Sequence, residues 1–173
     1  MTIRNPFLVY GYQSPAYFCD REEETHLLLS ALQNGRNVTL MSPRRMGKTG
    51  LIQNVFYKAQ AENPEVLCFY IDIYPTQNLH NLVSLFAKTI LCKDDTLAQS
   101  VKIGISTFFK TLRPVLSTDP LTGAMSASID FKPQESESTL AEIFAYLKES
   151  GKECYIAIDE FQQIAEYDDN TGI

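Results

Sequence analysis

Ser42-Pro43-Arg44-Arg45-Met46-Gly47-Lys48-Thr49 is the segment from which the rest of the chain can be interpreted. It follows a short apolar run at 38–41. The apolar residues after it recur at helical spacing: Leu51, Ile52, Val55, Phe56 and Ala59. When a strand, a loop ending in Gly-Lys-Thr and a helix follow one another, backbone N–H groups and the helix N-terminus can surround one anion. The sequence therefore predicts a phosphate-binding loop between a strand at 38–41 and a helix starting near Lys48.

The residues of this loop suggest separate roles toward a nucleoside triphosphate. Gly47 lets the backbone approach closely, Lys48 reaches the β- and γ-phosphate oxygens, and the Thr49 hydroxyl is a ligand for Mg²⁺. The predicted nucleotide-binding residues are Ser42, Pro43, Arg44, Arg45, Met46, Gly47, Lys48, Thr49 and Gly50. The usual pattern begins with glycine, whereas this loop begins with Ser42 and is stiffened by Pro43. A basic turn without a ligand is the alternative interpretation.

A second motif lies near the end of the chain, where the apolar run 154–158 leads directly into Asp159 and Glu160. This is the Walker B arrangement, and an acidic residue at the C-terminal end of a parallel strand lies where α/β sheets bind ligands. Asp159 is predicted to hold Mg²⁺ through its water shell, together with Thr49. Glu160 is predicted to orient and deprotonate the attacking water, with Lys48 as the other catalytic residue. The alternative is a buried strand that ends at a solvated acidic turn.

The two motifs together narrow the class of protein. A GTPase would normally carry an Asn-Lys-x-Asp motif, which this chain lacks, and small-molecule kinases commonly lack the glutamate after the magnesium aspartate. Mg²⁺-dependent ATP hydrolysis fits best. A regulatory module that binds ATP without hydrolysing it, and a DNA-associated ATPase of a mobile element or defence system, remain alternatives.

Composition sets further limits on the interpretation. The 173 residues, 45% hydrophobic and 21% charged, suit one globular domain. A formal net charge of −6 argues against broad nucleic-acid binding, although Arg44-Arg45 leaves local contact open. The absence of an 18-residue apolar run and of a signal-peptide core predicts a cytoplasmic protein without a membrane partner. Four dispersed cysteines and two histidines indicate reduced thiols and no metal cluster.

The remaining sequence alternates between helical and strand patterns, which predicts an α/β fold. The first helix is expected to begin at Asp20 as a capping box with Glu23, to carry an apolar face of Leu27, Leu28, Leu29 and Leu32, and to end at Gly35. The further expected elements are a strand at 66–73, a helix from Asn78, a less regular helix at 96–112, a β-hairpin at 113–131 with its turn at 118–123, a helix capped by Ser138 or Thr139 and ended by Gly151, and a strand at 154–158.

Several segments resemble the prokaryotic AAA+-like ATPases of the archaeal-ATPase/STAND type. The resemblance lies in Asn5-Pro6-Phe7, Phe18-Cys19-Asp20-Arg21-Glu22, the loop 42–49, Asp119-Pro120-Leu121-Thr122-Gly123 and Ile158-Asp159-Glu160-Phe161-Gln162. It implies a P-loop NTPase fold of the ASCE/AAA+-like kind, three-layered α/β/α with a mainly parallel sheet, and an ATP-dependent switch. It also implies that Arg21 and Glu22 belong to an entry motif close to the nucleotide.

By the same resemblance the domain is expected to be incomplete at its C-terminus. The family places a sensor-bearing fourth strand beside the first strand, then the Walker B strand, then the second strand outside. Residues 1–173 are therefore interpreted as one truncated ATPase domain that lacks the sensor strand and the C-terminal domain. The gap left in the sheet is expected to close directly, to be filled by another chain, or to reflect a fragment. A fragment or truncated form that tends to self-associate is the favoured interpretation.

Overall fold

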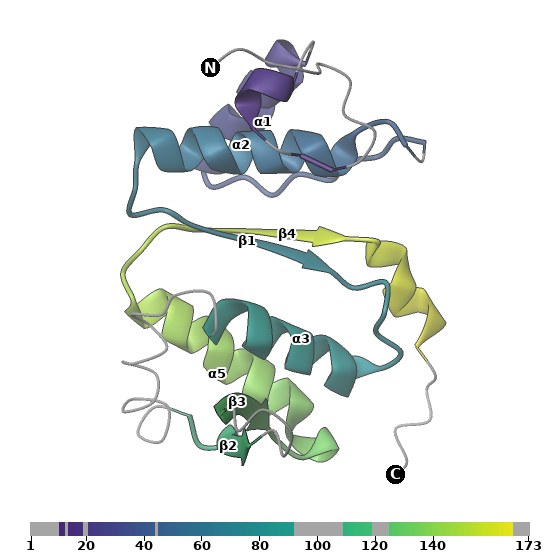
Figure 1. Ribbon diagram of the computed structural model, residues 1–173, viewed down its shortest axis with the longest axis vertical. Helices are drawn as coiled ribbons and strands as arrows, with labels where there is room; N and C mark the ends of the chain where they lie inside the picture. The colour runs from purple at the N-terminus through teal and green to yellow at the C-terminus, as the bar shows by residue number, and fades with distance from the viewer. Residues whose placement is uncertain are drawn as a thin grey trace. The chain divides into compact units, whose positions relative to one another are not determined.

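The computed structural model describes residues 11, 12, 14–18, 21–43, 45–91, 109–118 and 125–167 (Figure 1). The chain forms two compact units. Unit 1 contains Met1–Cys68 and Glu153–Ala157, and unit 2 contains Phe69–Lys152 and Ile158–Ile173. Within the described ranges, no helix combines the length and the apolar character that crossing a membrane requires.

Unit 1 is built on two helices that pack against each other, α1 (Glu22–Gln33) and α2 (Lys48–Glu62). A short 3₁₀ turn, η1 (Pro15–Tyr17), precedes them. As the helical spacing predicts, α2 buries one face. Its buried apolar residues are Leu51, Val55, Phe56 and Ala59. These apolar side chains leave water on packing, which is the main stabilising contribution to the unit.

The start and the apolar face of α1 differ from the prediction. Arg21 is the N-cap residue and no side chain caps the helix, while the predicted cap, Asp20, lies outside the described residues. Three glutamates in the first turn favour this end through the helix dipole. Leu29 is buried, but Leu27 is 68% exposed, so the predicted apolar face is narrower than the run of leucines suggests. The helix ends as predicted, since Gly35 follows it with φ +66°.

The strand expected at 38–41 is not formed, and this prediction was wrong. The structure assigns neither helix nor strand to residues 36–43, and Val38 and Met41 are 44% and 89% exposed. An apolar run becomes a strand only when a neighbouring strand accepts and donates its backbone hydrogen bonds. The sheet that the structure describes therefore does not close directly onto this segment.

The sheet contains the other two predicted strands, β1 (Leu67–Asp72) and β4 (Cys154–Asp159) (Figure 1). The N–H of Leu67 donates to the carbonyl of Glu153 at 2.9 Å, and the N–H of Ile73 donates to the carbonyl of Asp159 at 3.2 Å. From the first bond to the second, the residue number increases on both strands, from 67 to 73 on one and from 153 to 159 on the other, so the strands run parallel. The result is a mixed α/β structure with a small two-stranded parallel sheet flanked by helices.

Unit 2 packs α3 (Leu79–Leu91) against α5 (Ser136–Glu149). The helical spacing predicted the buried face of α3. Its buried residues are Leu82, Val83, Phe86, Ala87, Ile90 and Leu91. Helix α5 begins earlier than predicted, after the 3₁₀ turn η2 (Pro133–Glu135). The hydroxyls of Ser138 and Thr139 donate to the carbonyl of Glu135 and do not cap N–H groups, which explains the shift in the start of the helix.

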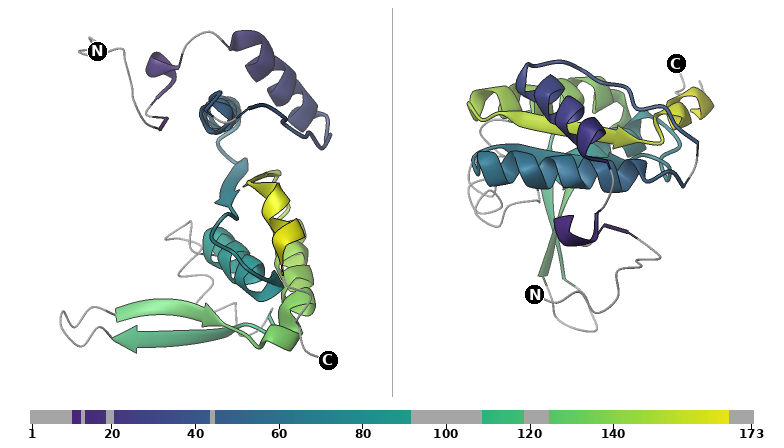
Figure 2. Two further views of the ribbon diagram at one scale, coloured as in Figure 1. Left: turned by 90° about the vertical axis from the view of Figure 1, so that its right-hand side faces the viewer. Right: turned by 90° about the horizontal axis from the view of Figure 1, so that it is seen from above.

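The predicted hairpin is present in unit 2, and Figure 2 shows its arms lengthwise in the left view. Strand β2 (Arg113–Thr118) pairs antiparallel with β3 (Met125–Asp130), with Arg113 opposite Asp130 and Thr118 opposite Met125. β3 also contacts α3. Apart from Thr118, the predicted turn between the arms lies outside the described residues. Residues 96–108 of the less regular helix that the sequence predicts also lie outside them.

Candidate functional site

The loop predicted to bind phosphate has two residues in left-handed backbone conformations. Arg45 has φ +64° and Gly47 has φ +72°, and Gly47 is the N-cap residue of α2. No side chain caps this helix, and its first turn holds no acidic residue. The first N–H groups of α2 therefore have no capping side chain at the end of the helix that carries a partial positive charge.

Lys48, the first residue of α2, folds back over the loop. Its Nζ donates a hydrogen bond to the carbonyl oxygen of Ser42 at 2.9 Å. This contact joins the two ends of the loop, and the lysine side chain is half-buried there. Within the described residues Lys48 forms no ion pair, because the ion pair that the structure shows is that of Arg21 with Glu24. The amine is thus held at the loop by a neutral carbonyl group.

The segment before α1 approaches the same loop within unit 1. A Cβ atom placed on Gly50 would lie 3.4 Å from Cε2 of Phe18, so the absence of a side chain at residue 50 makes room for the aromatic ring. Nη1 of Arg21 donates to the carbonyl oxygen of Met46 at 2.9 Å. The family resemblance implied an entry motif that contains Arg21 but specified no contact, and the structure shows a contact of Arg21 with the loop backbone.

In unit 2, both carboxylate oxygens of Asp159 accept hydrogen bonds at the end of β4. The Tyr70 hydroxyl donates to Oδ2 at 2.5 Å, and the backbone N–H of Glu160 donates to Oδ1 at 2.9 Å. Tyr70 is on the neighbouring strand β1, so the pairing of the two strands brings these side chains together. The carboxylate is held in one orientation at the carboxyl end of a parallel strand, where polar ligand-binding groups commonly lie.

Glu160 follows β4 in a left-handed conformation, with φ +56°. Its carboxylate accepts a hydrogen bond from Nε2 of Gln162, in the 3₁₀ turn η3 (Phe161–Glu166). Among the described residues, Arg45 and Glu160 are the non-glycine residues with positive φ. This conformation costs on the order of 1–3 kcal/mol and concentrates at functional sites. One such residue lies in each of the two predicted motifs.

The predicted site residues are divided between the two units. Ser42, Pro43 and 45–50 lie in unit 1, Asp159 and Glu160 lie in unit 2, and Arg44 lies outside the described residues. In the part of the chain that the structure describes, no three His, Cys, Asp or Glu side chains are grouped as a metal site. Thr49 and Asp159, the predicted magnesium ligands, are therefore not part of a preformed all-protein metal cluster.

Sequence reasoning did not predict the polar contacts of Tyr70 and Asn54, although each had a signal. Tyr70 places a hydroxyl inside an apolar strand, and such a hydroxyl needs a partner. Asn54 lies at a core position of α2, is only 3% exposed and must likewise be hydrogen-bonded. It accepts from the Tyr12 hydroxyl at 3.2 Å and donates to Oγ1 of Thr25 at 3.3 Å. The sequence shows that these groups need partners, but it does not identify them.

Replacement of Tyr70 by phenylalanine is expected to lower the free energy of unfolding by about 1–3 kcal/mol, because it removes a hydrogen bond to a carboxylate. Urea unfolding of the purified chain measures this. Tyr74→Phe is the matched control, since Tyr74 follows the same strand and is 64% exposed. Equal unfolding free energies for the two variants would show that the Tyr70 hydroxyl does not stabilise the strand end.

A search of protein-family models, of curated proteins and of solved structures finds no match to this chain.

Proposed function

We propose that this chain binds ATP with Mg²⁺ and hydrolyses it as a P-loop ATPase. The observation that carries the proposal is the shape of the loop before α2. Two residues with positive φ lead into an uncapped helix N-terminus, and the Lys48 amine is folded onto the carbonyl oxygen of Ser42. Uncapped N–H groups, a helix dipole and a lysine at one loop form a site for a phosphate group.

The charges around the loop support an anionic ligand. Arg45 and Lys48 form no ion pair with the described residues, and the first turn of α2 has no carboxylate. The chain as a whole carries a net charge of −6, yet the described residues provide no carboxylate ion-pair partner for these two cationic side chains. A triphosphate would supply the missing negative charge, and its oxygens would accept from the lysine and the loop N–H groups.

Asp159 and Glu160 supply the carboxylates of the proposal. Mg²⁺ prefers oxygen ligands, retains several waters and is commonly bound through one or two protein groups plus substrate phosphates. The donor set of Thr49 and Asp159, a hydroxyl and a carboxylate, fits this requirement. The metal would neutralise negative charge on the phosphates. Glu160 would hold the attacking water and accept its proton.

The pairing of the two parallel strands bears on the proposed P-loop ATPase fold. The resemblance to AAA+-like ATPases of the archaeal-ATPase/STAND type predicts that the second strand pairs with the Walker B strand, and the pairing of β1 with β4 supports this. We infer a three-layer α/β/α P-loop domain in which ATP acts as a switch on a partner or on a second copy of the chain.

Thermal unfolding with and without nucleotide tests the proposal. At a MgATP concentration about a hundred times its Kd, binding is expected to add about 2.7 kcal/mol to the free energy of unfolding. For a chain of this size, that gain raises the melting temperature by about 5–10 °C. EDTA is expected to reduce the shift, because it removes the metal that joins the phosphates to Thr49 and Asp159. An unchanged melting temperature at millimolar MgATP would contradict nucleotide binding.

Phosphate release separates the enzyme from its alternatives. Turnover of MgATP by the chain supports hydrolysis. Binding without turnover would instead support a regulatory module that uses ATP only as a ligand. A rate that rises on addition of DNA would support the DNA-associated ATPase.

A further inference from the structure

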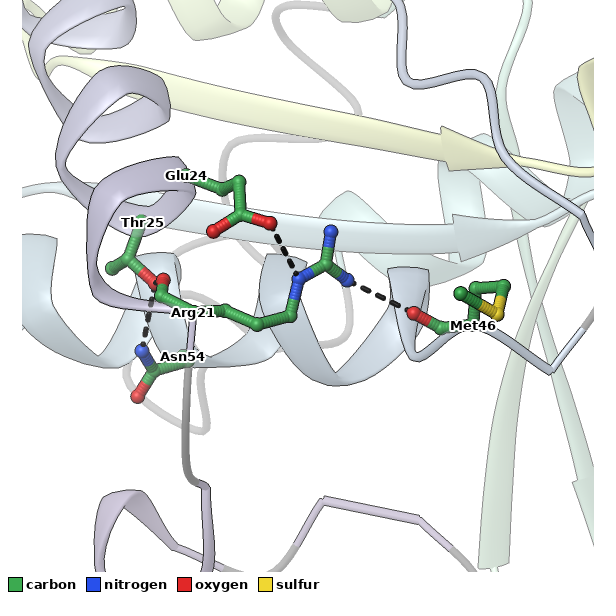
Figure 3. A network of polar contacts seen from close by, with 5 residues as sticks. All are labelled: Arg21, Glu24, Thr25, Met46 and Asn54. Carbon is green, nitrogen blue, oxygen red and sulfur yellow. Dashed lines mark hydrogen bonds and ion pairs between the residues drawn. The ribbon is translucent and has the colours of Figure 1, made fainter.

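Arg21 links the start of α1 to the centre of the predicted phosphate-binding loop (Figure 3). Its Nη1 donates to the carbonyl oxygen of Met46 at 2.9 Å, and Met46 directly precedes Gly47 and Lys48. A Cβ built on Gly47 would lie 3.9 Å from this same Nη1. The guanidinium group therefore lies beside the Met46–Gly47 peptide.

Two further contacts hold the guanidinium group and its backbone in place. Nε of Arg21 donates to Oε1 of Glu24 at 3.1 Å, which is also an ion pair. The pKa of Glu24 is lowered by a hydrogen bond from its own backbone and by Arg21, so the carboxylate stays charged at neutral pH. Because the guanidinium is a planar and rigid fork, fixing Nε also restricts the direction in which Nη1 points.

The backbone of Arg21 is anchored to α2 by a chain of buried polar groups (Figure 3). Oγ1 of Thr25 donates to the carbonyl oxygen of Arg21 at 2.7 Å, and Nδ2 of Asn54 donates to Oγ1 of Thr25 at 3.3 Å. Thr25 and Asn54 are 1% and 3% exposed. Arg21 is thus connected to α2 twice, once through the loop and once through Asn54. This closed connection fixes its position relative to the loop.

We propose that Arg21 is a positioning residue that selects the orientation of the Met46–Gly47 peptide, a role that rests on the proposed binding of nucleotide by this loop. Glycine adopts both signs of φ readily, so the peptide before Gly47 is free to rotate unless a contact holds it. The described peptide bonds include no cis bond, and in a trans peptide the C=O and N–H point in opposite directions. By holding the Met46 carbonyl, Arg21 directs the Gly47 N–H away from itself, where it donates to a phosphate oxygen of the ligand.

The peptide can be observed by itself in solution. Met46-Gly47 is the one Met-Gly pair in the sequence, so protein labelled with carbonyl-¹³C methionine and ¹⁵N glycine gives a single cross-peak in a spectrum that correlates amide groups with preceding carbonyls. In nucleotide-free protein, Arg21→Met is expected to move the ¹³C signal of the Met46 carbonyl upfield, because this carbonyl group loses its charged hydrogen-bond donor. Arg36→Met, an exposed arginine just after α1, is the matched control and is expected to leave the signal in place. An unmoved signal in Arg21→Met would overturn the proposal.

MgATP titration of the same variants measures the consequence for binding. Arg21→Met is expected to weaken MgATP binding by about tenfold to a hundredfold, the usual worth of a hydrogen bond to a charged group. Arg21→Lys keeps a charged donor and is expected to recover part of the affinity. Arg21→Leu, which also removes the charged donor, replaces Arg21→Met in both measurements if the methionine variant does not fold. Equal affinities of the wild-type chain, Arg21→Lys and Arg21→Met would overturn the positioning role.

The two measurements separate this proposal from the proposed function. If the wild-type chain does not bind MgATP but the carbonyl signal moves in Arg21→Met, nucleotide binding fails while the orienting contact of Arg21 is supported. If the wild-type chain binds MgATP but the signal does not move, the proposed function stands and the role of Arg21 is overturned.

Discussion

Lys48→Ala is expected to remove MgATP hydrolysis and to weaken MgATP binding severely. The lysine amine is a charged group held at the loop, where it donates to the carbonyl oxygen of Ser42 at 2.9 Å. In the proposed complex it exchanges this neutral acceptor for phosphate oxygens whose charge increases during the reaction. Loss of one such preorganised donor lowers kcat by on the order of 10²–10³-fold. Phosphate release and nucleotide titration measure the two effects.

The stability of Lys48→Ala distinguishes loss of binding from loss of folding. The substitution removes one hydrogen bond to a backbone carbonyl from a half-buried side chain, so it is expected to cost only about 1 kcal/mol of unfolding free energy. Lys58→Ala is the matched control, because Lys58 lies on the same helix and is exposed. Hydrolysis that persists at the wild-type rate in Lys48→Ala would remove the loop from the proposed reaction.

Glu160→Gln is expected to abolish hydrolysis and to leave MgATP binding intact. The substitution keeps the shape of the side chain but removes the proton acceptor that the proposal assigns to the attacking water. General base catalysis contributes on the order of 10²–10⁴-fold, which is the loss of phosphate release that we expect. Glu166→Gln, at the end of the 3₁₀ turn that follows Glu160, is the control with unchanged turnover. Equal rates for the wild-type chain and Glu160→Gln would show that Glu160 is not the general base, and would leave Asp159 as the acidic residue of this motif with a proposed role in hydrolysis.

Glu160→Gly tests whether the glutamate is retained for chemistry or for structure. At φ +56° a glutamate is strained by on the order of 1–3 kcal/mol, and glycine relieves this strain while adding freedom to the unfolded chain. The variant is therefore expected to keep roughly the wild-type melting temperature and to lose turnover. A large fall in melting temperature would show instead that the carboxylate, which accepts from Gln162, stabilises this turn.

Elements with a strong local pattern could be predicted from the sequence. Helical spacing after residue 50 predicted α2, the apolar run before Asp159 predicted β4, and the change of period predicted the hairpin of β2 and β3. These patterns are local because each element places its own apolar side chains on one side. The loop could also be located, since a glycine before the helix start permits the positive φ that Gly47 adopts.

Predictions that needed a partner elsewhere in the chain were less successful. The run at 38–41 has the composition of a strand, yet it is left out of the sheet because no described strand pairs with it. Leu27 belongs to an apolar run but remains largely exposed, because α2 covers only one side of α1. Local composition indicates what a segment prefers, whereas burial depends on which surface reaches it.

From the sequence alone follow the order of the described α-helices and of the strands that form, the loop Ser42–Thr49 and the acidic end of β4. The tertiary structure decided which side chains meet: Arg21 with the carbonyl of Met46, and Tyr70 with Asp159. The residues of the first pair lie 25 positions apart in the sequence, and those of the second pair lie 89 positions apart. Contacts over such separations leave no period in the sequence, because they depend on the packing of whole elements and on the need of each polar group for a partner.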